Sequence, residues 1–303
     1  MFEALIQMAA LILCGVAWRY LAPGGQDAKS TRVALTGLVY YLFLPALVLL
    51  VLWQAPLGAD SFKIALVASV AILASLLVMG WLCNACGMDR PTRGAALLAA
   101  AFPNATYLGL PVLEATLGKE ARSIAIQYDL FACTPLLLTI GVWIAMRYGN
   151  VSGARLGLAN LLKVPALWAA LLAVILNMLA VPVPEGLRTW LQTLANGVVP
   201  LMLISLGLSL YISREHLQSM RSIFPVLGIK LIFMPAVVLG LSMSLGMHGM
   251  LQQAVVLEAA MPSMVLGLVL CDRYGLNSVV YAAAVTVSTA FSFITLGIWY
   301  SMV

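Results

Sequence analysis

The sequence predicts an all-helical integral membrane protein with ten transmembrane spans, arranged as two five-span halves of opposite orientation. Of its 303 residues 63% are hydrophobic and 9% are charged, and the mean hydropathy is +1.04. So few charged residues cannot cover a soluble globule of this length. Ten apolar windows of about 20 residues, the length that crosses a ~30 Å hydrocarbon core, fit along the chain. Proline-containing motifs recur at matching positions in the two halves, which predicts an internal repeat.

The ten predicted spans fill almost the whole chain. Glu3 stands where a signal peptide has a basic residue, so we expect the first window to be a span and not a cleaved leader. The connections are too short to fold as separate soluble domains. We place the spans at 3–21, 31–53, 62–83, 94–118, 122–146, 163–180, 187–211, 222–245, 250–272 and 277–301.

The longest connection divides the chain into two halves. We predict a first five-helix repeat over 1–147, a cytoplasmic linker over 148–162 and a second five-helix repeat over 163–303. Because each half has an odd number of spans, the second half enters the membrane from the opposite side.

The basic residues predict the orientation of the chain. Of the sixteen Lys and Arg residues, eleven fall in loops after odd-numbered spans, four fall on the other side, and Lys230 lies inside a span. By the positive-inside rule the eleven-residue side is cytoplasmic, so both termini are expected outside. The basic residues are scattered and not interleaved with aromatics, so we expect no nucleic-acid partner.

Cys83 and Cys86 form an isolated C-x-x-C without a second pair or histidines, which predicts packing residues and no metal or cofactor.

Two proline landmarks support the repeat. Leu44-Pro45 in span two matches Val199-Pro200 in span seven, and the run 100–104 in span four matches the run 259–263 in span nine. The spacings, 155 and 159 residues, are similar. A common spacing of this kind favours two related halves.

The prolines in spans four and nine predict broken helices. Pro103 is followed by Asn104, and Pro262 is followed by Ser263. Proline interrupts a helix, and Asn and Ser are preferred at helix N-termini, so each helix is expected to stop and restart in mid-membrane. The restarted halves point their free N–H groups toward the bilayer centre, where they attract anions. Broken helices at this depth line a cavity in known transporters, so we expect a substrate site here.

The motif around Pro103 resembles a known family. Asn104, Gly109 and Pro111 after Pro103 are similar to the span-four crossover motif of the auxin efflux carrier family. That family includes the plant PIN carriers and bacterial carriers described as malonate or malate permeases. The run from Ala260 to Thr289 resembles its ninth and tenth spans.

The resemblance implies a fold similar to the bile-acid symporters and sodium/proton antiporters. Two inverted five-helix repeats would cross their broken helices four and nine, with spans 1, 2, 6 and 7 as a scaffold and spans 3–5 and 8–10 as a transport domain. An elevator movement, a homodimer and a bacterial inner (cell) membrane location would follow. Asn104 would hold a substrate carboxylate, whereas Ser263 stands where relatives have Asn or Gln.

The predicted site combines the two breaks with three ionisable residues inside spans. Asp129, Lys230 and Glu258 each cost roughly 2.5–3.5 kcal/mol to insert, which makes them functional candidates. Either acid could be neutralised by a proton or a cation and so couple transport to a gradient, or could pair with Lys230. Lys230 could also extend to the cytoplasmic interface. The predicted substrate-binding residues are Pro103, Asn104, Ala105, Thr106, Tyr107, Pro262, Ser263 and Met264.

The predicted function is secondary transport of a small organic anion. The substrate would be a carboxylate such as malonate or malate, or an auxin-like weak acid, and its identity rests on the resemblance. The coupling ion, H⁺ or Na⁺, stays open, and membrane lipid is the other expected partner.

The alternatives to a carrier are an intramembrane enzyme using Asp129 or Glu258, and a substrate-gated channel or sensor. The spans contain no Ser/His, two-Asp or metal-ligand constellation, which argues against the enzyme. The sequence has no P-loop, which argues against an ATP-driven pump.

Overall fold

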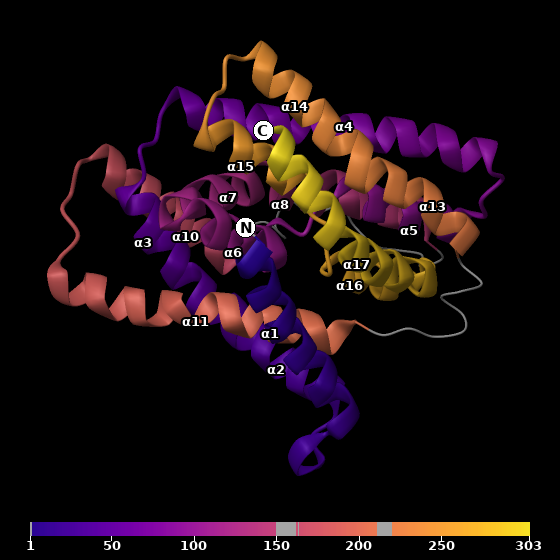
Figure 1. Cartoon of the computed structure of the whole chain (residues 1–303), viewed down its shortest axis with the longest axis horizontal. Coiled ribbons are helices and arrows are strands. Elements are labelled where there is room, and N and C mark those ends of the chain that lie inside the picture. Colours follow the sequence, from indigo (N-terminus) through magenta and orange to yellow (C-terminus); the bar gives the residue numbers. More distant parts are fainter. Residues whose placement is uncertain (1, 150–161, 163, 211–219) are drawn as a thin grey trace.

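Helices make up the regular structure of the described chain. The computed structural model describes all residues except 1, 150–161, 163 and 211–219 (Figure 1). The α-helices are α1 (Phe2–Leu21), α2 (Ala28–Leu38), α3 (Leu44–Gln54), α4 (Ala59–Ala85), α5 (Arg90–Ala101), α6 (Leu110–Leu117), α7 (Arg122–Tyr128), α8 (Thr134–Leu136), α9 (Val142–Tyr148), α10 (Pro165–Met178), α11 (Glu185–Ser209), α13 (Met220–Gly228), α14 (Met234–Ser244), α15 (Met250–Ala259), α16 (Gly267–Tyr274) and α17 (Ser278–Met302).

The lengths of these helices confirm a multi-pass membrane protein. Within the described ranges, six helical runs are long and apolar enough to cross a membrane. They are Ala28–Gln54, Ala59–Ala85, Lys119–Tyr148, Glu185–Ser209, Ser222–Ser244 and Ser278–Met302. Two shorter apolar helices cover Ile6–Leu21 and Pro165–Met178. The ten-span inverted arrangement stays a prediction, and most of the predicted linker, 150–161, lies outside the described residues.

Polar caps begin three of the helices. The Asp27 carboxylate accepts hydrogen bonds from backbone N–H groups in the first turn of α2, and Asp89 accepts one in the first turn of α5. Asn277 does the same for α17. Caps of this kind satisfy N–H groups that have no partner within the helix. All three caps lie on the side that the basic residues assign to the cytoplasm.

Wide π-helical turns interrupt the longer runs just before proline. Proline removes one backbone hydrogen bond and its ring clashes with the carbonyl of the preceding turn, and a wider turn relieves that clash. The sequence predicts kinks at Pro45, Pro135, Pro200 and Pro235. The structure has continuous helical runs there, with a wide turn before Pro45, Pro135 and Pro235, while Pro200 lies inside α11. Four such turns are Val39–Phe43 before Pro45, Ala105–Gly109 before Pro111, Asp129–Cys133 before Pro135 and Ile229–Phe233 before Pro235. A further π-turn, Leu137–Gly141, follows Pro135.

One group of helices packs around α11. Helix α1 crosses α11 closely, as Figure 1 shows, and α3 packs against both α10 and α11. Gly15 of α1 and Gly207 of α11 face each other, and a Cβ on either would meet the backbone of the opposite helix. Small residues at such a crossing let two helices approach without intervening side chains.

Two side chains in this group cap helix C-termini. Asn177 of α10 donates from Nδ2 to the carbonyls of Leu52, Trp53 and Ala55, at 3.2, 2.9 and 2.8 Å, where α3 ends. Arg19 of α1 donates from Nη1 to the carbonyl of Leu208 near the end of α11, at 2.9 Å. These bonds satisfy carbonyls that the helices themselves leave free.

The remaining helices form a second group. Helix α4 packs against α5 and α14, and α17 packs against α5 and α13. Figure 1 shows α4 and α14 near one another and α17 crossing in front of α5. The broken helices α5–α6 and α15–α16 belong to this group and carry the predicted site.

Candidate substrate-binding site

Both predicted breaks are present, and they cross. Helix α5 ends at Ala101, and α15 ends at Ala259. The backbone becomes extended at Phe102 after α5, whereas a turn at Ala260 follows α15. Pro103 and Ser263 then pair as an isolated antiparallel β-bridge.

Two hydrogen bonds hold this crossing. The N–H of Asn104 donates to the carbonyl of Pro262 at 2.8 Å, and the N–H of Met264 donates to the carbonyl of Phe102 at 3.0 Å. Each break therefore satisfies polar backbone groups of the other, which is required where no water can do so. The extended segments are short, because helical structure begins again at Ala105 after the first break and at Gly267 after the second.

The side chain of Asn104 lies at this crossing without a protein partner. Asn104 is 0% exposed, and neither its Oδ1 nor its Nδ2 has a hydrogen-bond partner among the described residues. A buried amide left unpaired costs about 1–3 kcal/mol per polar group. An unpaired buried amide in a cavity is therefore a candidate ligand-binding group.

Ser263, the matching residue of the second break, is engaged. Its hydroxyl donates to the carbonyl of Ala99 at 2.7 Å, and its N–H donates to the hydroxyl of Ser288 at 3.1 Å. The Ser263 hydroxyl thus satisfies a carbonyl in the last turn of α5. The two halves of the crossing are chemically unequal, with one free amide and one occupied hydroxyl.

A cavity of about 70 Å³ adjoins the crossing. Four of the predicted substrate-binding residues line it, together with the predicted charged residue Asp129. Those four are Asn104, Thr106, Tyr107 and Met264. This space is hereafter the central cavity.

Asp129 lies in the central cavity with two hydroxyl partners. Its carboxylate is 6% exposed and accepts hydrogen bonds from the hydroxyls of Thr106 and Thr134, the latter at 3.0 Å. Thr134 is absent from the predicted site. It reaches Asp129 because a π-turn brings residues five apart onto one face, so the spacing Asp-x4-Thr before Pro135 is the signal that could have found it.

Glu258 is the second buried acid near the crossing. It is 0% exposed, and neither carboxyl oxygen has a hydrogen-bond partner among the described residues. The carboxyl lies against Gly109 in the wide turn of span four, where any Cβ would collide with it. Gly109 therefore makes room for Glu258, which links the first half of span nine to the second half of span four.

Lys230 is wholly buried. Its Nζ donates to the carbonyl of Ala259 at 3.2 Å and to the sulfur of Met234 at 2.7 Å. Within the described part of the chain, no ion pair joins Lys230 to Glu258 or Asp129. Lys230 does not extend to the membrane interface. It instead holds a carbonyl at the end of α15, where the second break begins.

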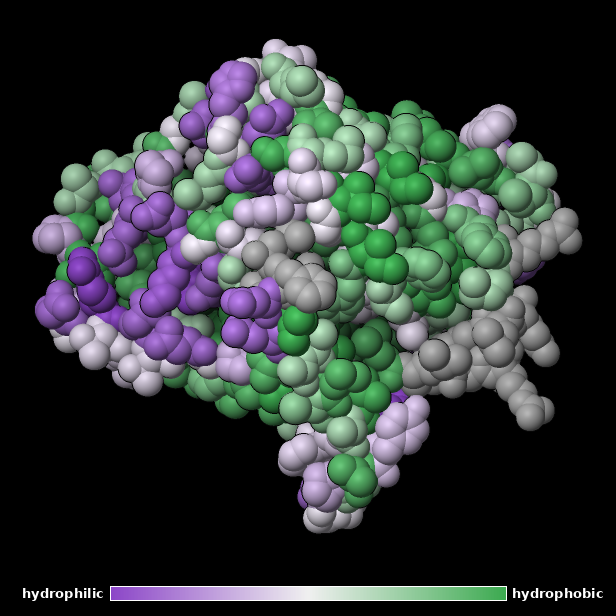
Figure 2. Space-filling view, viewed as in Figure 1, coloured by the Kyte–Doolittle hydropathy of each residue, from purple (hydrophilic) through white to green (hydrophobic). Residues whose placement is uncertain are grey.

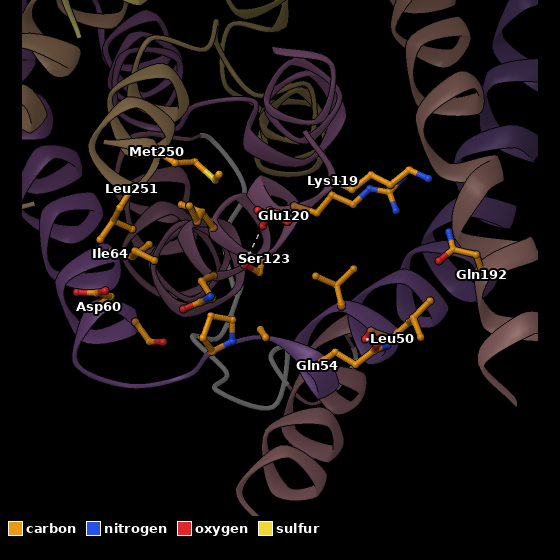
Figure 3. Close-up of a pocket in the computed structure, with 17 residues that line it drawn as sticks. Leu50, Gln54, Asp60, Ile64, Lys119, Glu120, Ser123, Gln192, Met250 and Leu251 are labelled. Atoms are coloured by element: carbon orange, nitrogen blue, oxygen red, sulfur yellow. Dashed lines mark hydrogen bonds between the residues drawn. The ribbon is translucent and has the colours of Figure 1, made fainter. Parts of the chain in front are cut away.

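The described residues also line two larger cavities. One, of about 600 Å³, is lined by the ends of α3, α4, α7, α11 and α15. Figure 3 shows Lys119 extending toward the helix that carries Gln192, with Asp60 and Ile64 on the far side. In Figure 2 hydrophilic residues gather over the region of α3 and α7, while apolar residues cover much of the rest of that face. We call this the wide vestibule.

The other cavity, of about 270 Å³, is bordered by Arg32, Tyr41 and Ser205. It shares Tyr40 and Tyr107 with the central cavity. On the opposite side, a space of only about 10 Å³ borders Thr106 and Asp129. The hydrogen-bonded Thr106–Asp129 pair thus forms a wall of the central cavity on the side away from Tyr40.

A multi-pass helical protein with crossed, broken helices around a buried free amide has the organisation of a membrane transporter. The chain belongs to the membrane transport protein family, whose model matches residues 2–153 and 154–300. This is the family of the auxin efflux carriers, so the resemblance in the sequence is confirmed.

Curated relatives agree with this class. An uncharacterized transporter from Methanothermobacter thermautotrophicus is 30% identical over 301 residues, which cover 98% of this chain and 96% of the relative. An uncharacterized transporter from Methanocaldococcus jannaschii is 28% identical over 68% of this chain and 67% of its own length. The uncharacterized transporter YfdV of Escherichia coli is 22% identical over 67% of this chain and 65% of its own length.

Proposed function

We propose that this transporter carries a small organic anion, a carboxylate such as malonate or malate, across the membrane as a secondary carrier. The observation that carries the proposal is the Asn104 side chain, which is buried, has no described hydrogen-bond partner and lines the central cavity at the crossing of two broken helices. The particular carboxylate is proposed from the family resemblance.

Neutral donors at the crossing favour an anion. The second half of span four restarts just after Asn104, so the N–H groups of its first turn have no helical partner. The amide of Asn104 adds a further donor, and Thr106, whose hydroxyl donates to Asp129, lines the same cavity. Such groups bind a carboxylate without a fixed positive charge, and moderate binding suits a carrier that must also release its substrate. In this proposal Pro103, Ala105, Tyr107, Pro262, Ser263 and Met264 shape the same site.

The helix packing supports a scaffold and a moving domain. The group of α1, α2, α3, α10 and α11 corresponds to the proposed scaffold of spans 1, 2, 6 and 7. Arg19 of span one caps span seven, and Asn177 of span six caps span two, which are matching contacts if the halves are inverted repeats. We propose ten spans in that arrangement, with the crossed helices moving together against the scaffold as an elevator.

The cavities support passage between two sides. The wide vestibule lies at the ends of spans that the basic residues assign to the outside, and the cavity near Arg32 lies at ends that they assign to the cytoplasm. The central cavity shares Tyr40 and Tyr107 with the cavity near Arg32. We also propose a homodimer in the cell membrane with both termini outside.

Counterflow in proteoliposomes tests this function. We expect unlabelled malonate or malate inside to drive saturable uptake of the labelled compound. Asn104→Ala should abolish this uptake while the protein still unfolds cooperatively on heating. Asn196→Ala, at an exposed asparagine of α11 bonded to Gln192, is the matched control and should retain uptake. Normal uptake by Asn104→Ala would contradict the site, and a conductance without counterflow would indicate a channel.

A further inference from the structure

We infer that Asp129, Thr106 and Thr134 form a binding site for one Na⁺ ion beside the substrate cavity. The inference rests on the proposed function for the role of that ion, which would couple carboxylate movement to a sodium gradient. The site itself stands on its own geometry.

The oxygen atoms of this site come from two spans. Asp129 and Thr134 belong to span five, at the two ends of its π-turn, and Thr106 belongs to the wide turn of span four. Both hydroxyls already contact the carboxylate of Asp129. Hard cations take carboxylate and neutral oxygen ligands, and discontinuous helices supply such sites in transporters. A hydroxyl can rotate, so each threonine can turn a lone pair toward the ion.

The charge of Asp129 has no counterpart in the described structure. Its only described hydrogen-bond partners are neutral hydroxyls, and no described basic side chain forms an ion pair with it. Lys230, a buried basic residue of span eight, is instead bonded to Ala259 and Met234. A buried carboxylate without a counter-charge is costly, and one monovalent cation removes that cost.

Sodium fits the hydrogen bonds better than a proton does. The two threonines donate to different oxygens of Asp129, and donation to both oxygens stabilises the ionised carboxylate. A single carboxylate also balances one positive charge, not two. Glu258 lies nearby with both oxygens unpaired and faces Gly109, so it is the group better suited to carry a proton.

The position of Asn104 gives the ion its role. The free amide of Asn104 and the carboxylate of Asp129 line the same central cavity. A substrate carboxylate at Asn104 would be repelled by an ionised Asp129 in so small a space. A cation between Thr106, Thr134 and Asp129 converts this repulsion into attraction, so ion and substrate are expected to bind together.

Thermal unfolding of the purified, substrate-free protein tests the site. The melting temperature is measured in NaCl, KCl and choline chloride at equal ionic strength. We expect Na⁺ to raise it saturably, because a ligand that binds only the folded state stabilises it. Asp129→Asn should lose the Na⁺ shift, and Thr134→Val should raise the half-saturating Na⁺ concentration at least roughly tenfold. Thr139→Val is the matched control, since Thr139 bonds only carbonyls of its own helix.

The outcomes separate this inference from the proposed function. A wild-type protein with no Na⁺-specific shift, or an equal shift in Asp129→Asn and Thr134→Val, overturns the sodium site. Carboxylate uptake driven by a proton gradient alone would do the same and leave the proposed function standing. A Na⁺ shift lost with Asp129 and Thr134, in a protein that moves no carboxylate, would support the ion site and refute the proposed function.

Discussion

Some buried polar side chains at the crossing have hydrogen-bond partners and others have none among the described residues. Ser263 is bonded to α5, Lys230 to the end of α15 and Asp129 to two hydroxyls, whereas Asn104 and Glu258 have no described partner. Groups that are buried and unpaired are costly, and they persist where function requires them. The two unpaired residues are therefore the strongest points for tests by substitution.

The contact between Gly109 and Glu258 predicts a destabilised variant. Gly109→Ala places a methyl group on the Glu258 carboxyl, so the free energy of unfolding should fall by about 1–3 kcal/mol, as overpacking does. Denaturant or thermal unfolding in detergent measures this. The double variant Gly109→Ala with Glu258→Ala should lose less than the sum of the two single changes. Gly240→Ala, where a Cβ meets nothing, is the control, and an equal effect there would refute the contact.

Sequence alone could predict residues but not their partners. Pro103 and Pro262 indicated the breaks because proline interrupts a helix locally. The expected capping is not observed: the Asn104 side chain makes no capping hydrogen bond, and α16 begins only at Gly267, beyond Ser263. The bond from Ser263 to Ala99 depends on the crossing of segments 164 residues apart, so no local pattern signals it. The sequence likewise allowed Lys230 to pair with Asp129, to pair with Glu258 or to extend to the interface. Its bond to the carbonyl of Ala259 depends on the position of α15 beside it, which the sequence does not give.

At the scale of elements, helix ends are satisfied by side chains from other helices. Asn177 meets three carbonyls where α3 ends, and Trp53 donates from Nε1 to the carbonyl of Val181, just beyond α10, at 2.8 Å. These contacts join α3 and α10 at one membrane surface. They fix the two helices relative to each other, as a static scaffold requires.

Asn177→Leu should weaken this joint. The substitution keeps the branching and the number of non-hydrogen atoms but removes the donors, so the carbonyls at the end of α3 lose partners and unfolding should become easier by about 1–3 kcal/mol. The melting temperature in detergent reports the change. Asn196→Leu, at an exposed asparagine of α11, should have little effect. A similar loss in both variants would show that the capping bonds contribute nothing specific.

Hydropathy predicts the positions of the helices well but does not predict the irregular turns inside them. The predicted span 62–83 falls within α4, and 277–301 nearly coincides with α17. The π-turns were missed because proline indicates a local disturbance without specifying its form. A kink and a wide turn both remove the clash with the ring, and the surrounding packing decides between them.

At the scale of the whole molecule, the two helix groups meet around the central cavity. The cavity near Arg32 shares Tyr40 and Tyr107 with the central cavity, whereas the described lining of the wide vestibule has no residue in common with it. Composition was enough to predict a multi-pass membrane protein, because bilayer thickness fixes the length of apolar runs. The grouping of helices was expected only from the family resemblance, since packing between apolar helices leaves little signal in a single sequence.

The distribution of basic residues predicts which surface is outside. A cysteine at Lys119, in the wide vestibule, should react with a membrane-impermeant maleimide in intact cells. A cysteine at Arg90 should react only after permeabilisation, because positively charged loops stay in the cytoplasm. A background with Cys14 and Cys86 replaced by Ser serves both variants, since these two native cysteines are exposed. The reverse labelling pattern would invert the proposed orientation.

The wide turns also change the phase of the helices that contain them. Each π-turn adds about one residue beyond the 3.6 of an α-helical turn, which rotates everything downstream by about 100°. Residues after Cys133 therefore face a direction that an uninterrupted periodicity, counted from Arg122, would assign to their neighbours. Deleting one residue inside Asp129–Cys133 would restore an ordinary winding but turn the rest of span five away from its present neighbours. In these spans the number of residues before a position therefore determines which neighbours its side chain contacts, in addition to the identity of that side chain.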